Sequence, residues 1–230
     1  MYHRVLLKIS GEALSSEQSV ISRETVLSTV EKIKAVRNKG VQIGIVVGGG
    51  NIMRGRSAEG MERNRADHMG MLATAINSLA LQDALEQAGV PCVVQSAVDM
   101  DRFCDKFSAR SARQALSDGK VVIFACGSGC PFFSTDTAAA LRAAEIGADA
   151  LLLAKNIDAI YSADPKVDPN AIRYSRISYD RVVAENLRAT DLTAITLCKE
   201  QKIPIRAFAL DQIELIFDDD SIGTHIVEHE

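Results

Sequence analysis

Residues 42–51 read QIGIVVGGGN, an apolar run that passes directly into three glycines and an asparagine. Such a run, rich in Ile and Val, is typical of a central strand that is covered on both faces. Because glycine has no Cβ, three glycines in a row let backbone N–H groups approach a ligand closely. In an open α/β sheet, ligands bind at the carboxyl ends of the strands. The stretch therefore predicts a buried strand, 42–47, followed by an anion-binding loop.

This loop has two other interpretations. A tight turn with positive φ angles would also use glycine, but Asn51 and Arg54 favour an anion site, since a guanidinium donates in a fork to phosphate oxygens. Residues 50–57, GNIMRGRS, also approach the Walker A pattern of P-loop proteins. Arg56 stands where that pattern has Lys, and a planar guanidinium does not replace a compact ammonium. The P-loop is therefore the weaker alternative.

Apolar runs like the one at 42–47 recur along the chain and alternate with helical patterns. Apolar residues follow a helical period over 24–39, 68–88 and 135–146, and a glycine directly follows each segment as a stop signal. This alternation predicts an α/β fold, a three-layer αβα sandwich around a mostly parallel central sheet. The other expected strands are 5–9, 92–95, 121–125, 150–154 and 205–209.

The chain has 230 residues, a length that suits one α/β domain of two closely joined lobes. The segment 158–180 interrupts the strand–helix alternation with two Asp-Pro pairs, which favour turns. We expect an ordered excursion there, near the boundary between the lobes. The first lobe is predicted to span roughly 1–148 and the second roughly 149–230.

Composition narrows the class of protein. Hydrophobic residues make up 47% and charged residues 24%, and the net charge of -4 argues against a protein that coats nucleic acid or anionic membrane. No apolar run is long enough to span a bilayer, and the first residues enter a strand-like run without a leader pattern. The five cysteines are scattered through apolar segments, as free thiols in a reducing compartment would be. We expect a cytoplasmic protein whose partners include neither nucleic acid nor membrane.

Two further glycine-containing loops follow expected strands. Residues 8–12 read KISGE, and Lys8 at the strand end can reach the charge on a transferring phosphoryl group. Lys8 could instead be an ordinary solvated side chain; the presence of a second such loop favours the phosphate role. Residues 127–136 read GSGCPFFSTD and offer hydroxyls, backbone donors and a helix N-terminus to an anionic or polar ligand.

Several polar residues near these loops have a structural and a functional interpretation. Asp136 could cap the helix 135–146, a role compatible with orienting a nearby lysine. Asp67 at the start of the long helix is explained by capping alone, and the neighbouring His68 by packing or capping. Tyr161 and Asp164 could contact a base or ribose, although alone they would pass for turn residues. Cys126 and Cys130 lack a second cysteine pair or a nearby histidine, so no metal site on the protein is expected.

Taken in order, these segments resemble the amino-acid-kinase superfamily and, within it, the bacterial uridylate kinases. The most specific match is DHMGMLA at 67–73, which distinguishes this branch from aspartate, glutamate and carbamate kinases. The resemblance spans almost the whole chain. The other matching segments are LKISGEAL at 7–14, GGGN at 48–51 with Arg54-Gly55, PFFSTD at 131–136, YSADP at 161–165 and DLTA at 191–194.

The resemblance implies in-line transfer of the γ-phosphoryl group of ATP, accompanied by Mg²⁺, to UMP, giving ADP and UDP. It also implies a homohexamer, feedback inhibition by UTP and a role in pyrimidine nucleotide synthesis. It implies three catalytic residues: Lys8 and Arg54 would offset the charge on the transferring group, and Asp136 would position Lys8. The ATP site would comprise Lys8, Ile9, Ser10, Gly11, Gly50, Arg54, Lys155, Asn156, Tyr161 and Asp164. The UMP site would comprise Gly49, Asp67, Ser128, Gly129, Cys130, Pro131, Phe132, Phe133, Ser134 and Thr135.

Three positions depart from the family pattern. Cys130 stands where the family has an amide, and because a thiol is a poor donor and acceptor, uracil selection must depend more on backbone groups. Ala159 stands where the family commonly has glycine. Residues 15–20, SSEQSV, lack the glycines that many relatives have in a segment tied to GTP activation, so we expect such activation to be weak or absent. A non-catalytic nucleotide sensor and a kinase of a carboxylate or carbamate are the alternative functions.

Overall fold

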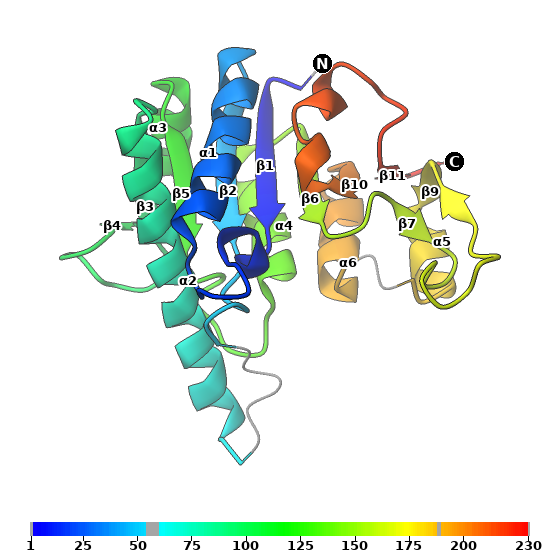
Figure 1. The fold of residues 1–230 in the computed structure, drawn as a ribbon, viewed down its shortest axis with the longest axis horizontal. Helices are drawn as coiled ribbons and strands as arrows, with labels where there is room; N and C mark the ends of the chain where they lie inside the picture. The colour runs from blue at the N-terminus through cyan, green and yellow to red at the C-terminus, as the bar shows by residue number, and fades with distance from the viewer. Residues whose placement is uncertain (1, 54–59, 188–189, 230) are drawn as a thin grey trace.

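The computed structural model describes residues 2–53, 60–187 and 190–229. A nine-stranded sheet crosses the molecule in the order β4-β3-β5-β2-β1-β6-β10-β11-β9 (Figure 1). Neighbouring strands are parallel throughout except for the antiparallel pair β10 and β11. The strands are β1 (Arg4–Ile9), β2 (Gln42–Val47), β3 (Cys92–Ser96), β4 (Asp105–Lys106), β5 (Val121–Ala125), β6 (Ala150–Lys155), β9 (Arg176–Ser178), β10 (Ile205–Ala209) and β11 (Thr224–Val227).

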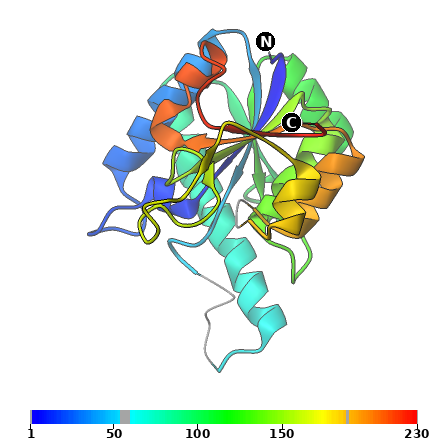
Figure 2. The same ribbon diagram turned by 90° about the vertical axis from the view of Figure 1, so that its right-hand side faces the viewer.

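Helices cover both faces of this sheet, so the predicted three-layer αβα sandwich is confirmed (Figure 2). The alternating residues of β1 show how the layers form. Val5, Leu7 and Ile9 belong to one buried cluster with α1 and α2, whereas Leu6 belongs to a second cluster with α3, α4, α5 and α6. The helices are α1 (Arg23–Asn38), α2 (Arg63–Gln87), α3 (Ala109–Ser117), α4 (Thr135–Ile146), α5 (Tyr179–Ala184) and α6 (Leu192–Glu200).

The longest helix begins earlier than the sequence pattern predicted. α2 starts at Arg63, and the side chain of Glu62 caps it by accepting from the N–H groups of Asn64 and Arg65. The prediction that Asp67 and His68 open this helix is therefore wrong, because both lie in its second turn. The first turns are polar because this end of α2 projects beyond the sheet (Figure 1), so no apolar period marked them. No described helix is both long and apolar enough to cross a bilayer.

The predicted excursion after β6 contains a small hairpin. β7 (Ile160–Tyr161) pairs antiparallel with β8 (Arg173–Tyr174), and the chain then continues into β9 and α5. The intervening turns use their aspartates as expected, since the carboxylates of Asp164 and Asp168 accept backbone N–H groups two residues ahead. The excursion is therefore an ordered segment packed on the later strands.

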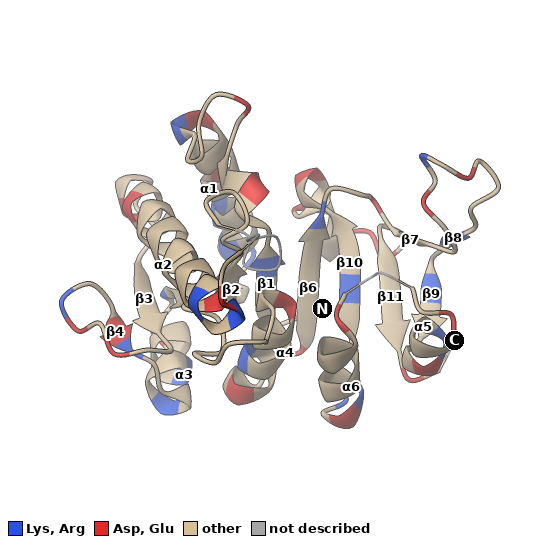
Figure 3. Cartoon of the chain, turned by 90° about the horizontal axis from the view of Figure 1, so that it is seen from below, with Lys and Arg blue, Asp and Glu red and all other residues tan. Residues whose placement is uncertain are grey.

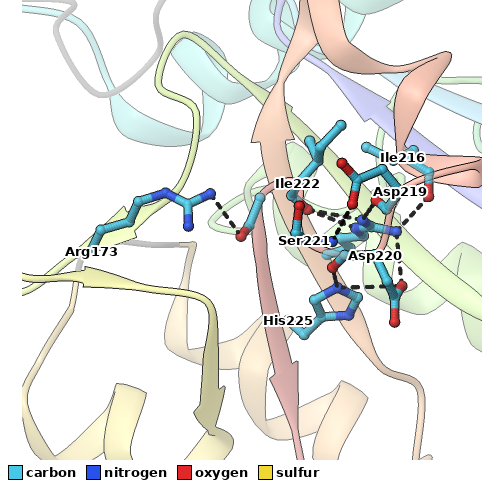
Figure 4. Close-up of polar contacts among 9 residues, drawn as sticks. Arg173, Ile216, Asp219, Asp220, Ser221, Ile222 and His225 are labelled. Carbon is cyan, nitrogen blue, oxygen red and sulfur yellow. Dashed lines mark hydrogen bonds and ion pairs between the residues drawn. The ribbon is translucent and has the colours of Figure 1, made fainter.

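A buried arginine, Arg206, organises the connection from β10 to β11, and Figure 4 labels the residues Ile216, Asp219 and Ile222 whose carbonyl oxygens it contacts. This connection contains only the short 3₁₀ turns η3 (Leu210–Gln212) and η4 (Leu215–Phe217). Arg206 on β10 is 1% exposed, and its guanidinium donates to the carbonyl oxygens of Ile216, Asp219 and Ile222. Because a buried carbonyl needs a donor, the guanidinium here replaces the hydrogen bonds that regular structure would supply.

The central strand β1 lies where the chain changes direction across the sheet. Its neighbours are β2 on one side and β6 on the other. The chain builds β2 to β5 on the first side and then crosses to β6, β10 and β11 on the second. In α/β sheets, ligands bind outside the carboxyl ends of strands at such a switch point. The residues that follow β1, β2, β5 and β6 are therefore the place to look for a site.

Candidate active site

Two cavities open at the carboxyl ends of the strands, the side of the molecule shown in Figure 3. The first has a volume of 370 Å³ and lies between the loops after β2 and β5 and the start of α2. The second has a volume of 620 Å³ and lies beside the end of β6 and the excursion. Gly49, Gly50, Met53, Arg63, Asp67, Gly70, Met71, Thr74, Cys126, Gly127, Ser128, Cys130, Phe133, Ser134 and Thr135 line the first. Lys155, Asn156, Ile157, Tyr161, Asp164 and Leu187 are among the residues that line the second.

A largely buried charge cluster of Lys8, Asp136 and Lys155 lies beside the two cavities. Lys8 Nζ lies 2.7 Å from Asp136 Oδ1, and Lys155 Nζ lies 3.4 Å from Asp136 Oδ2. Among the described residues, no donor forms a hydrogen bond of good geometry with the Oδ1 atom, and its contact with Lys8 is an ion pair. Lys155 lines the second cavity, and Asp136 directly follows Thr135, which lines the first. The cluster is thus the point where groups bound in the two cavities could meet.

Strand register explains how these three side chains come together. Lys8 on β1 pairs with Leu153 on β6, and Lys155 lies two residues beyond Leu153 on the same face. That face also carries Leu6 and packs against α4. Asp136 lies in the first turn of α4, whose N-cap is the Ser134 side chain, so its carboxylate points between the two lysines.

Burial and neighbouring charges affect the pKa of Asp136 and the pKa of Lys155 with a different balance. Burial alone would raise the pKa of Asp136, but Lys8 and Lys155 outweigh burial and hold that pKa well below its usual value. The carboxylate is therefore ionised at neutral pH. Burial lowers the pKa of Lys155, and the attraction of Asp136 only partly opposes this effect. The ionised carboxylate of Asp136 therefore favours the charged form of Lys155.

The glycines after β1 and β2 are needed because the two loops pack closely. A Cβ on Gly11 would lie 2.2 Å from Asn51 Oδ1, and one on Gly48 would lie 3.0 Å from the nitrogen of Gly11. A Cβ on Gly49 would lie 2.8 Å from the carbonyl oxygen of Gly70 on α2. None of residues 48–50 has a positive φ, so the alternative of a turn that requires left-handed glycines is excluded. Close approach to Gly11 and to α2 explains the glycines at 48 and 49, and the approach of this loop to a ligand stays a prediction.

The loop between β5 and α4 has a strained backbone. Cys126 and Phe132 adopt positive φ angles of 62° and 71°, which are uncommon for residues with a side chain. The Cys126 N–H donates to Thr74 Oγ1, and the Phe132 N–H donates to Asp67 Oδ2, at 2.9 and 2.8 Å. Both partners lie on α2. Contacts with this helix therefore hold the loop in a shape that its sequence alone would not favour.

Arg63 is a residue of the first cavity that the sequence did not suggest. Its Nε lies 2.8 Å from Asp67 Oδ2, and its guanidinium lies 5.5 Å from the ring centre of Phe132. The spacing of four residues between Arg63 and Asp67 would have indicated a pair on one helix face. Because the helix was predicted to begin at residue 68, that signal was missed.

The structure places the predicted site residues in three groups. Among those predicted for UMP, Gly49, Asp67, Ser128, Cys130, Phe133, Ser134 and Thr135 line the first cavity, and so does Gly50, which was predicted for ATP. Among those predicted for ATP, Lys155, Asn156, Tyr161 and Asp164 line the second cavity. The predicted residues that line neither cavity are Lys8, Ile9, Ser10, Gly11, Gly129, Pro131, Phe132 and Asp136. Arg54 and the end of the Walker-like stretch lie outside the described residues.

Comparison with known proteins assigns the chain to a family. The model of the amino acid kinase family matches residues 3–208. The chain belongs to the amino acid kinase family. This amino acid kinase chain is similar to UMP kinase from Bacillus anthracis, with 32% identity, a TM-score of 0.95 and coverage of 100% of this chain and 97% of that one. The chain is also similar to UMP kinase from Ureaplasma parvum, with 36% identity, a TM-score of 0.93 and coverage of 99% of this chain and 100% of that one. Uridylate kinase from Archaeoglobus fulgidus is more distant, with 28% identity, a TM-score of 0.74 and coverage of 97% and 99%.

Proposed function

We propose that this amino acid kinase transfers the γ-phosphoryl group of ATP to UMP, giving ADP and UDP. The observation that carries the proposal is the cluster of Lys8, Asp136 and Lys155 beside two cavities, since Lys155 lines the second and Thr135, next to Asp136, lines the first. Both cavities fall within the range of about 300–1,000 Å³ that small-molecule sites occupy. The full-length similarity to UMP kinases identifies the acceptor.

In this proposal the two lobes divide the substrates between them. UMP occupies the first cavity, in the lobe of roughly residues 1–148, and ATP the second, in the lobe of roughly 149–230. The Asp67 carboxylate would accept from ribose hydroxyls, and Arg63 beside it is suited to the phosphate of UMP. Tyr161 and Asn156 line the second cavity, where they would contact adenosine.

Catalysis would rest on placement and on charge, since phosphoryl transfer asks little covalent chemistry of a protein. The ammonium groups of Lys8 and Lys155 would offset negative charge on the transferring group, with Asp136 holding both in place. Arg54, predicted to assist, lies outside the described residues. The phosphate of UMP is already ionised near pH 7, so the reaction needs no general base.

Mg²⁺ would enter with ATP and reduce the repulsion between phosphate oxygens. Among the described residues, no group of three or more His, Cys, Asp or Glu side chains forms a metal site. Mg²⁺ retains waters and is usually bound through nucleotide phosphates and at most one or two carboxylates, so the phosphates of ATP would supply protein-independent ligands.

We further propose a cytoplasmic homohexamer that supplies UDP for pyrimidine nucleotide synthesis and is inhibited by UTP. An exposed apolar stripe on α2, formed by Met69, Leu72 and Ile76, supports self-association. The glycine-free segment 15–20 supports weak or absent activation by GTP. A several-fold stimulation of the initial rate by GTP would contradict that last expectation.

A coupled assay of ADP formation tests the proposed reaction. The purified chain is incubated with ATP and Mg²⁺, with and without each of UMP, dUMP, CMP, aspartate and carbamate. We expect ADP only when a pyrimidine nucleoside monophosphate is present, with UMP giving the highest kcat/KM. ADP formation with aspartate or carbamate would indicate another amino acid kinase. Binding of nucleotides without turnover would indicate a sensor.

A further inference from the structure

The carboxylate of Asp136 has a third partner that lies outside the predicted site residues. Thr190 Oγ1 donates to Asp136 Oδ2 at 2.8 Å. The same oxygen faces Lys155 Nζ at 3.4 Å, while Oδ1 faces Lys8. Thr190 thus adds a neutral donor to a carboxylate that two lysines share.

Thr190 comes from a distant part of the chain that is fixed against α4. It lies immediately before Asp191, the N-cap of α6. Close by, the hydroxyls of Thr137 on α4 and Thr193 on α6 are 2.5 Å apart. The N-terminal ends of α4 and α6 therefore meet beside the charge cluster. This contact fixes the position of the Thr190 hydroxyl, so it can orient a side chain on the facing helix.

We propose that Thr190 is a positioning residue for phosphoryl transfer, whose hydroxyl sets the Asp136 carboxylate so that one oxygen faces each lysine. This inference rests on the proposed function, in which Lys8 and Lys155 meet the transferring group. Thr190 touches neither substrate in this account. Its effect reaches the reaction only through Asp136.

The need for such a residue follows from how a carboxylate rotates. The terminal torsion of an aspartate is broad, so the ion pairs alone leave its rotation loosely defined. The charged groups that face Asp136 are Lys8 from β1 and Lys155 from β6, with Asp191 acting on Lys155 from the start of α6. A hydroxyl that donates to Oδ2 selects one rotation and leaves Oδ1 to Lys8. Without the hydroxyl, the carboxylate can turn toward one lysine and release the other.

Replacement of the hydroxyl tests this role. Thr190→Val keeps the shape and removes the donor, whereas Thr190→Ser keeps the donor. For Thr190→Val we expect kcat to fall about ten-fold, the cost of about one hydrogen bond to a charged group, with the KM values for ATP and UMP within about two-fold of wild type. Thr190→Ser should retain most of the wild-type kcat. Thr196→Val is the matched control, since its hydroxyl only bonds to Leu192 O on the exposed side of α6.

Each result bears on the proposal. A wild-type kcat in Thr190→Val, or a loss in Thr190→Ser as large as in Thr190→Val, would overturn it. A rise in KM without a fall in kcat would also overturn the proposal, because a positioning role acts on kcat. Thr190→Ala serves as the second variant without a hydroxyl if Thr190→Val fails to fold, as judged by circular dichroism. If the wild-type chain does not phosphorylate UMP, the proposed function fails, whereas a wild-type enzyme unaffected by these variants refutes only the role of Thr190.

Discussion

Replacement of Asp136 by asparagine removes the carboxylate that forms ion pairs with Lys8 and Lys155. Asparagine keeps the size of the side chain and can still accept from Thr190, so the change is mainly one of charge. The side chains of Lys8 and Asp136 are only 11% and 14% exposed, so water compensates little for the loss. Two ammonium groups would then share a poorly hydrated site without the carboxylate that contacts both of them.

The structure sets the expected size of the effect. Removal of one partner from a buried ion pair costs about 3–5 kcal/mol of unfolding free energy. For a chain of this length, at about 2–4 °C per kcal/mol, the melting temperature should fall by about 6–20 °C. The exposed pair of Asp180 and Lys199 offers a matched control, and Asp180→Asn should cost less than about 1 kcal/mol.

The loss of unfolding free energy in Asp136→Asn should also depend on pH in a defined direction. Without Asp136, burial lowers the pKa of Lys155 further below its usual value, so the folded state binds fewer protons than the unfolded state. Stability then rises with pH between the folded and unfolded pKa of this lysine. Urea unfolding of the nucleotide-free Asp136→Asn variant is measured at several values between about pH 7 and pH 10. Its unfolding free energy should lie below that of the wild type by an amount that shrinks as the pH rises. A deficit no larger than that of Asp180→Asn, or one that grows with pH, would refute this account of the cluster.

Three other substitutions test the site and the fold. Lys8→Ala should lower kcat by at least about 100-fold while sparing UMP binding, and calorimetric loss of UMP affinity alone would contradict its role at the phosphoryl group. Asp67→Asn should raise the KM for UMP by about ten-fold with little change in that for ATP, and unchanged constants would count against the placement of UMP. Arg206→Lys should destabilise the chain by about 3 kcal/mol or more, because an ammonium cannot serve the carbonyls of Ile216, Asp219 and Ile222 together; a melting temperature equal to wild type would disprove that role.

The parts of the fold that the sequence predicted are those that are buried on both faces. The strands 42–47 and 121–125 agree with the structure to the residue, because a central parallel strand is a continuous apolar run, and 205–209 agrees although Arg206 interrupts its apolar run. Short edge strands such as β4 and the brief helices α5 and α6 carry too few residues for a period to emerge. The start of α2 was missed for a different reason, since its first turns are polar and project from the body.

The candidate site was also predicted only in part from the sequence. Its loops were predictable because glycines and hydroxyls follow strand ends, and that rule is local. The ion pair of Lys8 and Asp136 agrees with the expectation that the carboxylate lies beside this lysine. The contacts of Asp136 with Lys155 and Thr190 depend on the register of β1 and β6 and on the meeting of α4 with α6. Those relations join segments far apart in the chain, and no short pattern encodes them.

The central place of β1 has a consequence for synthesis on the ribosome. β1 is made first, and it pairs with β2 soon afterwards, but its other neighbour is β6. At about 5–20 residues per second, the roughly 100 residues between β2 and β6 take about 5–20 s to emerge. During that time the nascent β1 presents an open edge, the kind of surface that invites pairing with other chains. A chain that stops before β6 therefore leaves one edge of its own central strand unpaired.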